Sequence, residues 1–445
     1  MISILNTLYS TVVRKGAAFS AAINGLFAIL EARSTYFENE KGSKTSVKEL
    51  EDADLLDKAS IILTPTGYSK DVIHNVKPSS TTFGDMTLVK NGTSTRVDEN
   101  GFIAFNTTDI PRIDYSTGTG AILCELSSSN NVLYSEDASQ TSTWPVQSNV
   151  TISAVITAAP TGNIGTVYTL ERTGPGAYGL GQPISFTHSS GRSLGLSMWV
   201  RRRSGSGDTG ELSFGKGSGL VTYVNTYNVG SDWQRVTWAS TGGTTASYIE
   251  VRGEVGQVFE VWGAQAESGD YGKNGRVTSY IPTSGTIGNR NRDNYANGGD
   301  ATLIGQTEGV FYFEGASLTD YQSGRAMALS DGGAANRVVL FFDYAEAKIR
   351  TLVRDGNNNQ AILIQPIADQ KSFNKIAVKY KSGDIALWIN GTEVQTSTTA
   401  LSFTSPLNEL AFDQGNGSVH MDGLIKQVAV FKEALSDAEL TALTT

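Results

Sequence analysis

From about Ile61 onward, hydrophobic residues alternate with polar ones over short stretches. Runs such as GFIAF, LSMWVRRR and IALWING have the two-residue period of β-strands, and Gly, Asn and Ser fill the intervals between them. Strands at this spacing are typical of antiparallel sandwiches, not of parallel sheets with crossover helices. The sequence therefore predicts a mainly all-β protein.

The N-terminal segment follows a different pattern, in which apolar residues recur at near-heptad spacing. Such a stripe predicts a helix of about thirty residues that packs against a partner. Lys15 and Arg33 interrupt the stripe, which favours a short bundle or a docking helix over a long coiled coil. A helix that packs on its own chain is the alternative. The residues assigned to oligomerisation and docking are Leu5, Leu8, Val12, Phe19, Ile23, Leu26 and Leu30.

Two capping boxes predict further short helices. Ser46 and Glu49 have the spacing of a capping box and predict a minor helix that ends near Lys58. Ser436 and Glu439 predict a short helix at the C-terminal end in the same way. The apolar face of the first of these helices consists of Leu50, Leu55 and Leu56.

A stretch rich in Asn, Gly and Arg, residues 285–302, separates two sets of strands and marks the clearest domain boundary. We expect a loose link here. The predicted parts are a helical docking and oligomerisation segment at 1–60, a small β-rich connector at 61–130, a first antiparallel β-sandwich at 131–290 and a second at 303–445.

Charge and composition exclude several classes of partner. Lys and Arg number 35 against 44 Asp and Glu, so the formal charge is −9 and a nucleic-acid partner is not expected. The apolar stretch at 16–30 is too short and too polar to span a bilayer, so membrane insertion is not expected either. The single cysteine, Cys124, cannot form an internal disulfide, which fits assembly in a reducing cytoplasm.

Several stretches resemble known families. The closing segments ALWINGTEV, LNELAFDQGNG and GLIKQVAVFKEALSDAELTAL resemble the laminin G-like or concanavalin A-like jelly roll of phage and bacterial surface proteins. Residues 62–78, 94–126 and 130–144 resemble a family of tailed-phage virion proteins, and residues 261–286 resemble the end of a carbohydrate-binding-module-like sandwich found in them. The chain departs from the family at 127–129, where SSS replaces a basic, Asn-containing segment.

The resemblance implies a virion structural protein, a fibre, tail or head-fibre component assembled in the host cytoplasm and exposed on the particle. Its N-terminus would dock to other virion proteins, and its sandwiches would contact cell-surface or environmental glycans. We expect a homo-oligomer, a trimer in preference to a dimer. A purely structural head decoration or tail connector that binds no ligand is the alternative.

Side chains that would support catalysis are sparse. The histidines His74, His188 and His420 are far apart, and none has a second His or Cys at metal-ligand spacing. Nucleophile-elbow, P-loop and dinucleotide fingerprints are absent from the sequence. Glycoside hydrolysis, the remaining catalytic alternative, needs convergent carboxylates, but Asp343 and Glu346 fall on opposite strand faces. We therefore do not expect an enzyme.

Sugar recognition needs an apolar face and fixed polar groups, and the second sandwich offers candidates for both. Alternation places Leu387 and Ile389 on one face of a strand and Trp388 on the other, so Trp388 is predicted to face outward as a sugar platform. Packing of Trp388 under a loop or against a neighbouring subunit is the alternative.

Two acidic and amide-rich loops complete the candidate ligand-binding set. Their side-chain oxygens could bind sugar hydroxyls or a calcium ion, or they could be ordinary turn residues. No cofactor other than a calcium ion at these loops is expected. The candidate residues in these loops are Asp331, Asn336, Asp413 and Asn416.

Overall fold

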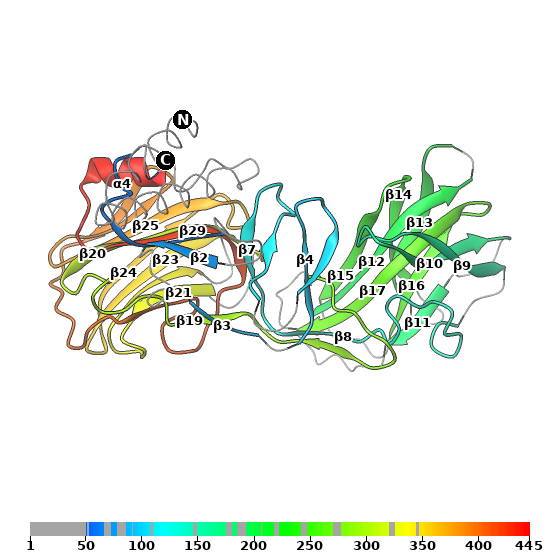
Figure 1. Ribbon diagram of the computed structural model, residues 1–445, viewed down its shortest axis with the longest axis horizontal. Coiled ribbons are helices and arrows are strands. Elements are labelled where there is room, and N and C mark those ends of the chain that lie inside the picture. Colours follow the sequence, from blue (N-terminus) through cyan, green and yellow to red (C-terminus); the bar gives the residue numbers. More distant parts are fainter. Residues whose placement is uncertain are drawn as a thin grey trace, which may run out of the picture.

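The computed structural model describes residues 50, 53–65, 73–77, 86–90, 92–106, 110–145, 149–174, 180–184, 193–205, 207–217, 222–241, 247–269, 277–319, 325–343 and 347–445. Two β-sandwiches lie at the ends of an elongated molecule, and a group of short hairpins lies between them (Figure 1). The prediction of a mainly all-β protein with two antiparallel sandwiches is confirmed. The docking residues predicted between positions 5 and 30 lie outside the described residues.

The C-terminal sandwich consists of two antiparallel sheets that enclose one large core. The first sheet has the order β2-β1-β29-β20-β25-β26-β27, and β7 also pairs with β29. The second has the order β24-β23-β22-β21-β28. The bounds in the first sheet are β1 (Ala59–Pro65), β2 (Ile73–Lys77), β6 (Ile113–Asp114), β7 (Ala121–Cys124), β20 (Glu308–Ser317), β25 (Asn374–Lys381), β26 (Ile385–Ile389), β27 (Thr392–Ser397) and β29 (Gly423–Phe431). Those in the second are β21 (Arg325–Ser330), β22 (Arg337–Phe342), β23 (Lys348–Asp355), β24 (Asn358–Pro366) and β28 (Glu409–Ala411).

This sandwich is assembled from both ends of the described chain. Strand β1 pairs with β29, so that Ile62 lies opposite Ala429 and Leu63 opposite Val428. Strand β7 pairs with the start of β29. The predicted boundaries therefore differ from the structure, because strands assigned to a connector at 61–130 complete a sheet of the C-terminal sandwich. The middle sandwich is inserted between β7 and β20.

The outer face of the first sheet carries a second apolar cluster. Helix α4 (Asp437–Thr444) begins at the capping box that the sequence predicts, in which Ser436 and Glu439 bond to each other's backbone amides. Its Leu440 and Leu443 are buried in this cluster. The apolar face predicted near the N-terminus belongs to the same cluster, and its members Leu50, Leu55 and Leu56 are buried.

The middle sandwich packs a sheet of order β15-β12-β17-β10-β9 against one of order β11-β16-β13-β14. Its core contains Leu196, Phe214, Val251 and Phe259, none of which is exposed. The bounds in the larger sheet are β9 (Val150–Ala158), β10 (Ile164–Arg172), β12 (Ser193–Ser204), β15 (Gln234–Thr241) and β17 (Val258–Gly269). Those in the smaller sheet are β11 (Leu180–Ile184), β13 (Gly210–Gly217), β14 (Thr222–Val229) and β16 (Ser247–Gly253).

Short paired strands connect the two sandwiches. The hairpin of β4 and β5 packs on the outer face of the larger middle sheet, where Ile103 joins a cluster with Trp199, Trp262 and Tyr280. Thr95 Oγ1 also donates a hydrogen bond to the carbonyl of Tyr280 at 2.7 Å. The pairs are β3 (Thr87–Val89) with β19 (Asn294–Ala296), β4 (Ser94–Val97) with β5 (Ile103–Asn106), and β8 (Ser128–Asn130) with β18 (Gly288–Arg290).

The stretch predicted to be a loose link at 285–302 is instead an ordered part of the junction. It contains β18 and β19, and its charged side chains form a buried ion cluster with Arg112, which precedes β6, and Glu125, which follows β7. Arg112 bonds to Glu125 at 2.7 Å and also to Asp293, and Arg290 bonds to Glu125. All four side chains are at most 3 % exposed, so two cations and two anions neutralise each other out of contact with water.

Burial opposes the charge of Arg112, but the neighbouring Asp293 and Glu125 outweigh it and raise the pKa of Arg112 above its ordinary value. We call these four residues, Arg112, Glu125, Arg290 and Asp293, the junction cluster.

Among the described residues, no helix is long and apolar enough to cross a membrane.

Candidate functional site

The loops that carry the predicted ligand-binding residues lie together at one end of the C-terminal sandwich. Asp331 begins the turn between β21 and β22, and Asp413 begins the turn that follows β28. The two turns touch, because Arg337 Nη1 donates a hydrogen bond to the carbonyl of Gln414 at 2.8 Å. The sequence placed these residues in separate loops, and the structure brings the loops side by side.

In the first loop, the predicted ligand-binding residues form hydrogen bonds with other parts of the protein and stabilise the loop. Asn336 is 1 % exposed. Its Oδ1 accepts hydrogen bonds from the backbone amides of Gly356 and Thr404, both at 3.0 Å. Its Nδ2 donates to Asp331 Oδ2 at 2.8 Å. Asn336 is therefore buried inside the loop network, with its polar atoms turned toward the chain and away from solvent.

In the second loop, Asp413 acts in the same way. Its Oδ1 accepts hydrogen bonds from the backbone amides of Gly415, Asn416 and Gly417 at 2.6, 3.2 and 3.2 Å. Asn416 is exposed, and its Oδ1 accepts a hydrogen bond from Ser418 Oγ at 2.6 Å. The described residues contain no group of three or more His, Cys, Asp or Glu side chains arranged to hold a metal ion.

His420 lies against the second loop, and its environment gives this end of the sandwich a pH dependence. Burial lowers the pKa of His420, nearby Arg292 lowers it further, and Asp413, whose carboxylate is 3.9 Å from Nδ1, opposes the shift. The folded protein therefore binds the proton more weakly than the unfolded chain does. Stability is expected to fall as the pH drops through the ordinary histidine value and to level off below the lowered one.

We expect His420→Gln to remove this part of the pH dependence. Denaturant unfolding at pH 7.5 and pH 5 should show that the native chain loses more stability on acidification than the variant does. An equal loss in both proteins would contradict the assignment to His420.

Trp388 does not face solvent, so its prediction as an outward sugar platform is wrong. Alternation placed it correctly on the face opposite Leu387, but that face is covered by helix α4. Trp388 is 5 % exposed and packs in the cluster of Leu440 and Leu443. Its Nε1 has no hydrogen-bond partner among the described residues, so the indole acts as an apolar surface.

Trp388→Phe is expected to lower the free energy of unfolding by about 1–2 kcal/mol, because the smaller ring leaves a gap beneath α4. Loss of the unpaired indole N–H limits the cost. Urea unfolding of the two proteins measures this difference. A variant of unchanged stability that no longer binds sugar would restore Trp388 as a binding residue.

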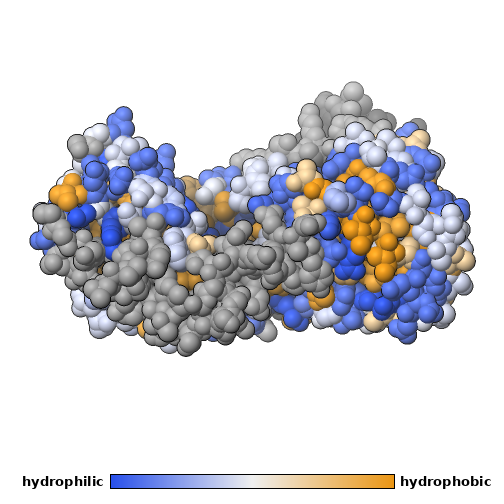
Figure 2. All heavy atoms as spheres, turned by 180° about the vertical axis from the view of Figure 1, so that it is seen from behind, coloured by the Kyte–Doolittle hydropathy of each residue, from blue (hydrophilic) through white to orange (hydrophobic). Residues whose placement is uncertain are grey.

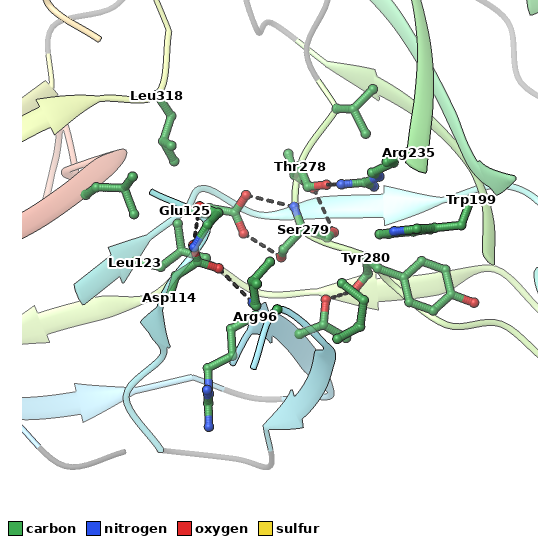
Figure 3. A pocket seen from close by; sticks show the side chains of 17 residues that line it. Arg96, Asp114, Leu123, Glu125, Trp199, Arg235, Thr278, Ser279, Tyr280 and Leu318 are labelled. Atoms are coloured by element: carbon green, nitrogen blue, oxygen red, sulfur yellow. Dashed lines mark hydrogen bonds between the residues drawn. The ribbon is translucent and has the colours of Figure 1, made fainter. Parts of the chain in front are cut away.

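A different concave site lies where the β4–β5 hairpin, the middle sandwich and the C-terminal sandwich meet. The pocket has a volume of about 400 Å³, and Figure 3 shows side chains that converge on it from all three parts. Val97 and Ile103 of the hairpin and Leu123, Leu318 and Leu424 of the C-terminal sandwich supply apolar lining. Ligand sites in proteins commonly lie at domain junctions of this kind and have a few polar groups on an apolar lining.

Aromatic rings support the side of the pocket formed by the middle sandwich. Trp199, on β12, makes an edge-on contact with Tyr280 at 5.5 Å and with Trp262 at 5.7 Å between ring centres. All three rings are buried. They fix the position of the polar groups in front of them.

Arg235 is the charged group held by these rings. Its guanidinium lies over the ring of Trp199, 4.3 Å from the ring centre. Nη1 donates to the carbonyl of Thr278 at 2.8 Å and Nη2 to Ser197 Oγ at 2.9 Å. Nε is buried and has no hydrogen-bond partner among the described residues. Burial lowers the pKa of Arg235 to about 10, and the nearby acids Glu267 and Glu125 oppose this shift without cancelling it.

The carboxylates that line the pocket are already bonded. Asp114 accepts hydrogen bonds from the backbone amides of Val97 and Ser116 at 2.8 and 2.9 Å. Glu125 belongs to the junction cluster and also accepts from the amide and hydroxyl of Ser279 at 2.9 and 2.6 Å. Both carboxylates therefore already have hydrogen-bond donors within the protein.

Residue-by-residue sequence reasoning missed this pocket, because its walls come from segments far apart in the chain. The lining residues of the hairpin lie within 94–126, and the segment Thr278–Tyr280 lies within 261–286.

Comparison with known proteins supports the fold of the C-terminal sandwich. Residues 316–441 match the Laminin_G_3 family model, described as the concanavalin A-like lectin/glucanases superfamily. The C-terminal sandwich is thus a laminin G-like, concanavalin A-like jelly roll, as the sequence predicted. No curated protein sequence matches the chain.

Solved structures with partial similarity include sugar-binding modules and sialidases. The CBM40 of the Ruminococcus gnavus IT-sialidase bound to α2,3-sialyllactose is 21% identical, with 33% of this chain and 86% of that chain covered and a TM-score of 0.29. The NanB sialidase of Streptococcus pneumoniae is 16% identical, with 33% and 25% covered and a TM-score of 0.29. Domain 4 of AbnA, a GH43 arabinanase of Geobacillus stearothermophilus in complex with arabinotriose, is 14% identical, with 39% and 84% covered and a TM-score of 0.29. At such similarity no ligand or activity passes from these proteins to this chain.

Proposed function

We propose that this chain is a non-catalytic glycan-binding protein that binds its sugar in the pocket at the junction of its parts. The observation that supports this proposal is the pocket itself, which combines an apolar lining, a guanidinium fixed over Trp199 and nearby hydroxyl groups in about 400 Å³. Sugars present both C–H faces and hydroxyls, so a lining of this kind suits them.

The biological setting that we propose is the surface of a phage particle. The support is the sequence resemblance of residues 62–78, 94–126 and 130–144 to tailed-phage virion proteins, and of residues 261–286 to the end of a carbohydrate-binding-module-like sandwich found in such proteins. In that setting the N-terminal segment docks to other virion proteins, and several copies bind a glycan-coated surface together. The overall affinity would then exceed the weak affinity of a single site, because the effective concentration of sites on the particle is high.

A purely structural role is the second candidate, and one observation favours it. Ile362 and Ile364 on the edge strand β24 are 48 % and 42 % exposed. Figure 2, a view from behind, shows hydrophobic residues gathered on the jelly-roll half of the molecule. Exposed apolar groups of this kind suit contact with a neighbouring protein. A decoration or connector protein would use such a contact and leave the pocket empty.

A glycan array probed with the full-length chain tests the glycan-binding function. We expect the chain to be retained on a defined subset of sugars. Ser116→Trp should abolish this retention, because Ser116 is exposed at the pocket and a large side chain there would occupy the pocket without disturbing the core. Asn416→Ala, an exposed change in the jelly-roll loop, is the matched control and should bind normally. Absence of binding to every sugar would favour the structural candidate.

A further inference from the structure

The carboxylates at the pocket have bonding partners in the protein, whereas the cation Arg235 has no anionic partner among the described residues. Each carboxylate near Arg235 is bonded to other groups. Glu267 accepts from the amide of Thr278 at 2.8 Å and from the hydroxyl of Ser128 at 2.5 Å, and Asp114 and Glu125 are bonded as described above. Arg235 itself forms no ion pair among the described residues, and its hydrogen bonds to Thr278 and Ser197 go to neutral oxygen atoms.

The guanidinium is also held in one orientation. Trp199 supports its plane, and the bonds of Nη1 and Nη2 to Thr278 and Ser197 fix its rotation. Figure 3 shows Arg235 and Trp199 stacked on one side of the pocket, with Asp114 and Glu125 on the other. A planar guanidinium fixed in this way matches the geometry of a carboxylate better than that of a single hydroxyl.

A partly buried cation without a bonded anion gains more from an anionic ligand than an exposed one does. Water screens an exposed charge, but in a recessed site the same charge interacts strongly with a carboxylate that replaces its solvent. The lowered pKa of Arg235 agrees with this, since the charges of Glu267 and Glu125 only partly offset the effect of burial.

We propose that the pocket binds an acidic glycan, a sugar that bears a carboxylate, and that Arg235 binds this carboxylate. This inference rests on the proposed glycan-binding function and narrows it to one class of sugar. The apolar lining from Val97, Leu318 and Leu424 would contact the sugar ring, and Ser116 would be within the same pocket to bond a hydroxyl. Arg235 is thus assigned as the residue that determines specificity.

Calorimetric titration of the full-length chain with matched pairs of sugars tests the proposal. The probes are sialyllactose against lactose, and oligogalacturonides against the same oligomers with their carboxylates reduced to alcohols. We expect the acidic member of at least one pair to bind about 10- to 100-fold more tightly, which is the effect of a hydrogen-bonded charge. Its affinity should also fall as the salt concentration rises.

Two variants test the role of Arg235. Arg235→Gln should reduce the affinity for the acidic sugar about 10- to 100-fold and that for the neutral sugar much less, because only the acidic sugar loses a partner of opposite charge. Arg235→Lys keeps the charge without the planar fork and should give an intermediate affinity. Equal losses for acidic and neutral sugars would overturn the assignment and indicate a structural role for Arg235. The native-chain titrations decide the ligand class even if a variant fails to fold.

The outcomes separate this inference from the proposed function. Equal affinity for the acidic and neutral members of every pair overturns the inference and leaves glycan binding intact. No binding to any sugar overturns both. An acidic peptide, tested as polyglutamate, that competes as well as the acidic sugar would overturn the sugar specificity, since it would show that a carboxylate alone is recognised.

Discussion

A chain that begins at residue 303 is expected not to fold, although it contains all of residues 316–441 that match the family model. The reason is strand pairing. Strand β29 lies between β20 and β1 and also pairs with β7, and the truncated chain lacks β1 and β7. Removal of Ile61 and Leu63, neither of which is exposed, also opens the core. An unpaired central strand in such a fragment is an aggregation site.

Circular dichroism and size-exclusion chromatography of the purified fragment measure this effect. A chain that begins at residue 50 retains β1, β7 and Leu50 and is the matched control, which should be monodisperse and unfold cooperatively. A fragment from 303 that is soluble and unfolds in one cooperative transition would show that β1 and β7 are dispensable.

Asp293→Ala is expected to lower the free energy of unfolding by about 3–5 kcal/mol, because it leaves Arg112 without one of its two carboxylate partners at a fully buried position. The backbone amide of Glu125 loses its acceptor in the same change, since it donates to Asp293 Oδ2 at 2.9 Å. Because the cluster joins strands of the connector to the 285–302 stretch, the junction should loosen as well.

Denaturant unfolding checks this expectation against a matched ion pair at the surface. Arg203 bonds to Glu260 at 3.3 Å but is 46% exposed, so Arg203→Ala should change stability by less than about 1 kcal/mol. If Asp293→Ala costs no more than this control, the junction cluster does not stabilise the fold.

The elements of the jelly roll could be predicted from the sequence because their signals are local. Asn390 and Gly391 have positive φ values of 47° and 82°, which is the backbone that an Asn-Gly hairpin turn requires and that this residue pair favours. The capping box at Ser436 is likewise formed. Alternation along β26 also separated Leu387 from Trp388 correctly. It could not show that α4 covers the second face, because alternation gives the direction of a side chain and not its neighbour.

The errors in domain boundaries arise from contacts between residues far apart in the chain. Strand β1 has a strand pattern, but nothing near it indicates that its partner is β29. The stretch 285–302 has the composition of a link, but Arg290 and Asp293 meet their partners Arg112 and Glu125 only in the folded chain. Composition describes a segment alone and does not reveal such pairing.

The pocket was missed for the same reason. Arg235 reads as one polar position on an alternating strand, and its role depends on Trp199 beneath it and on Thr278 beside it.

A hydrogen-exchange map of the full-length chain, recorded with and without the best-bound sugar from the array, tests most directly whether sugar binds at the junction pocket. Binding there predicts slower exchange at the β4–β5 hairpin and at the backbone amides of Thr278 and Ser279, with the jelly-roll loops at 331–336 and 413–418 unchanged. Slower exchange confined to those loops, with the junction unaffected, would contradict it.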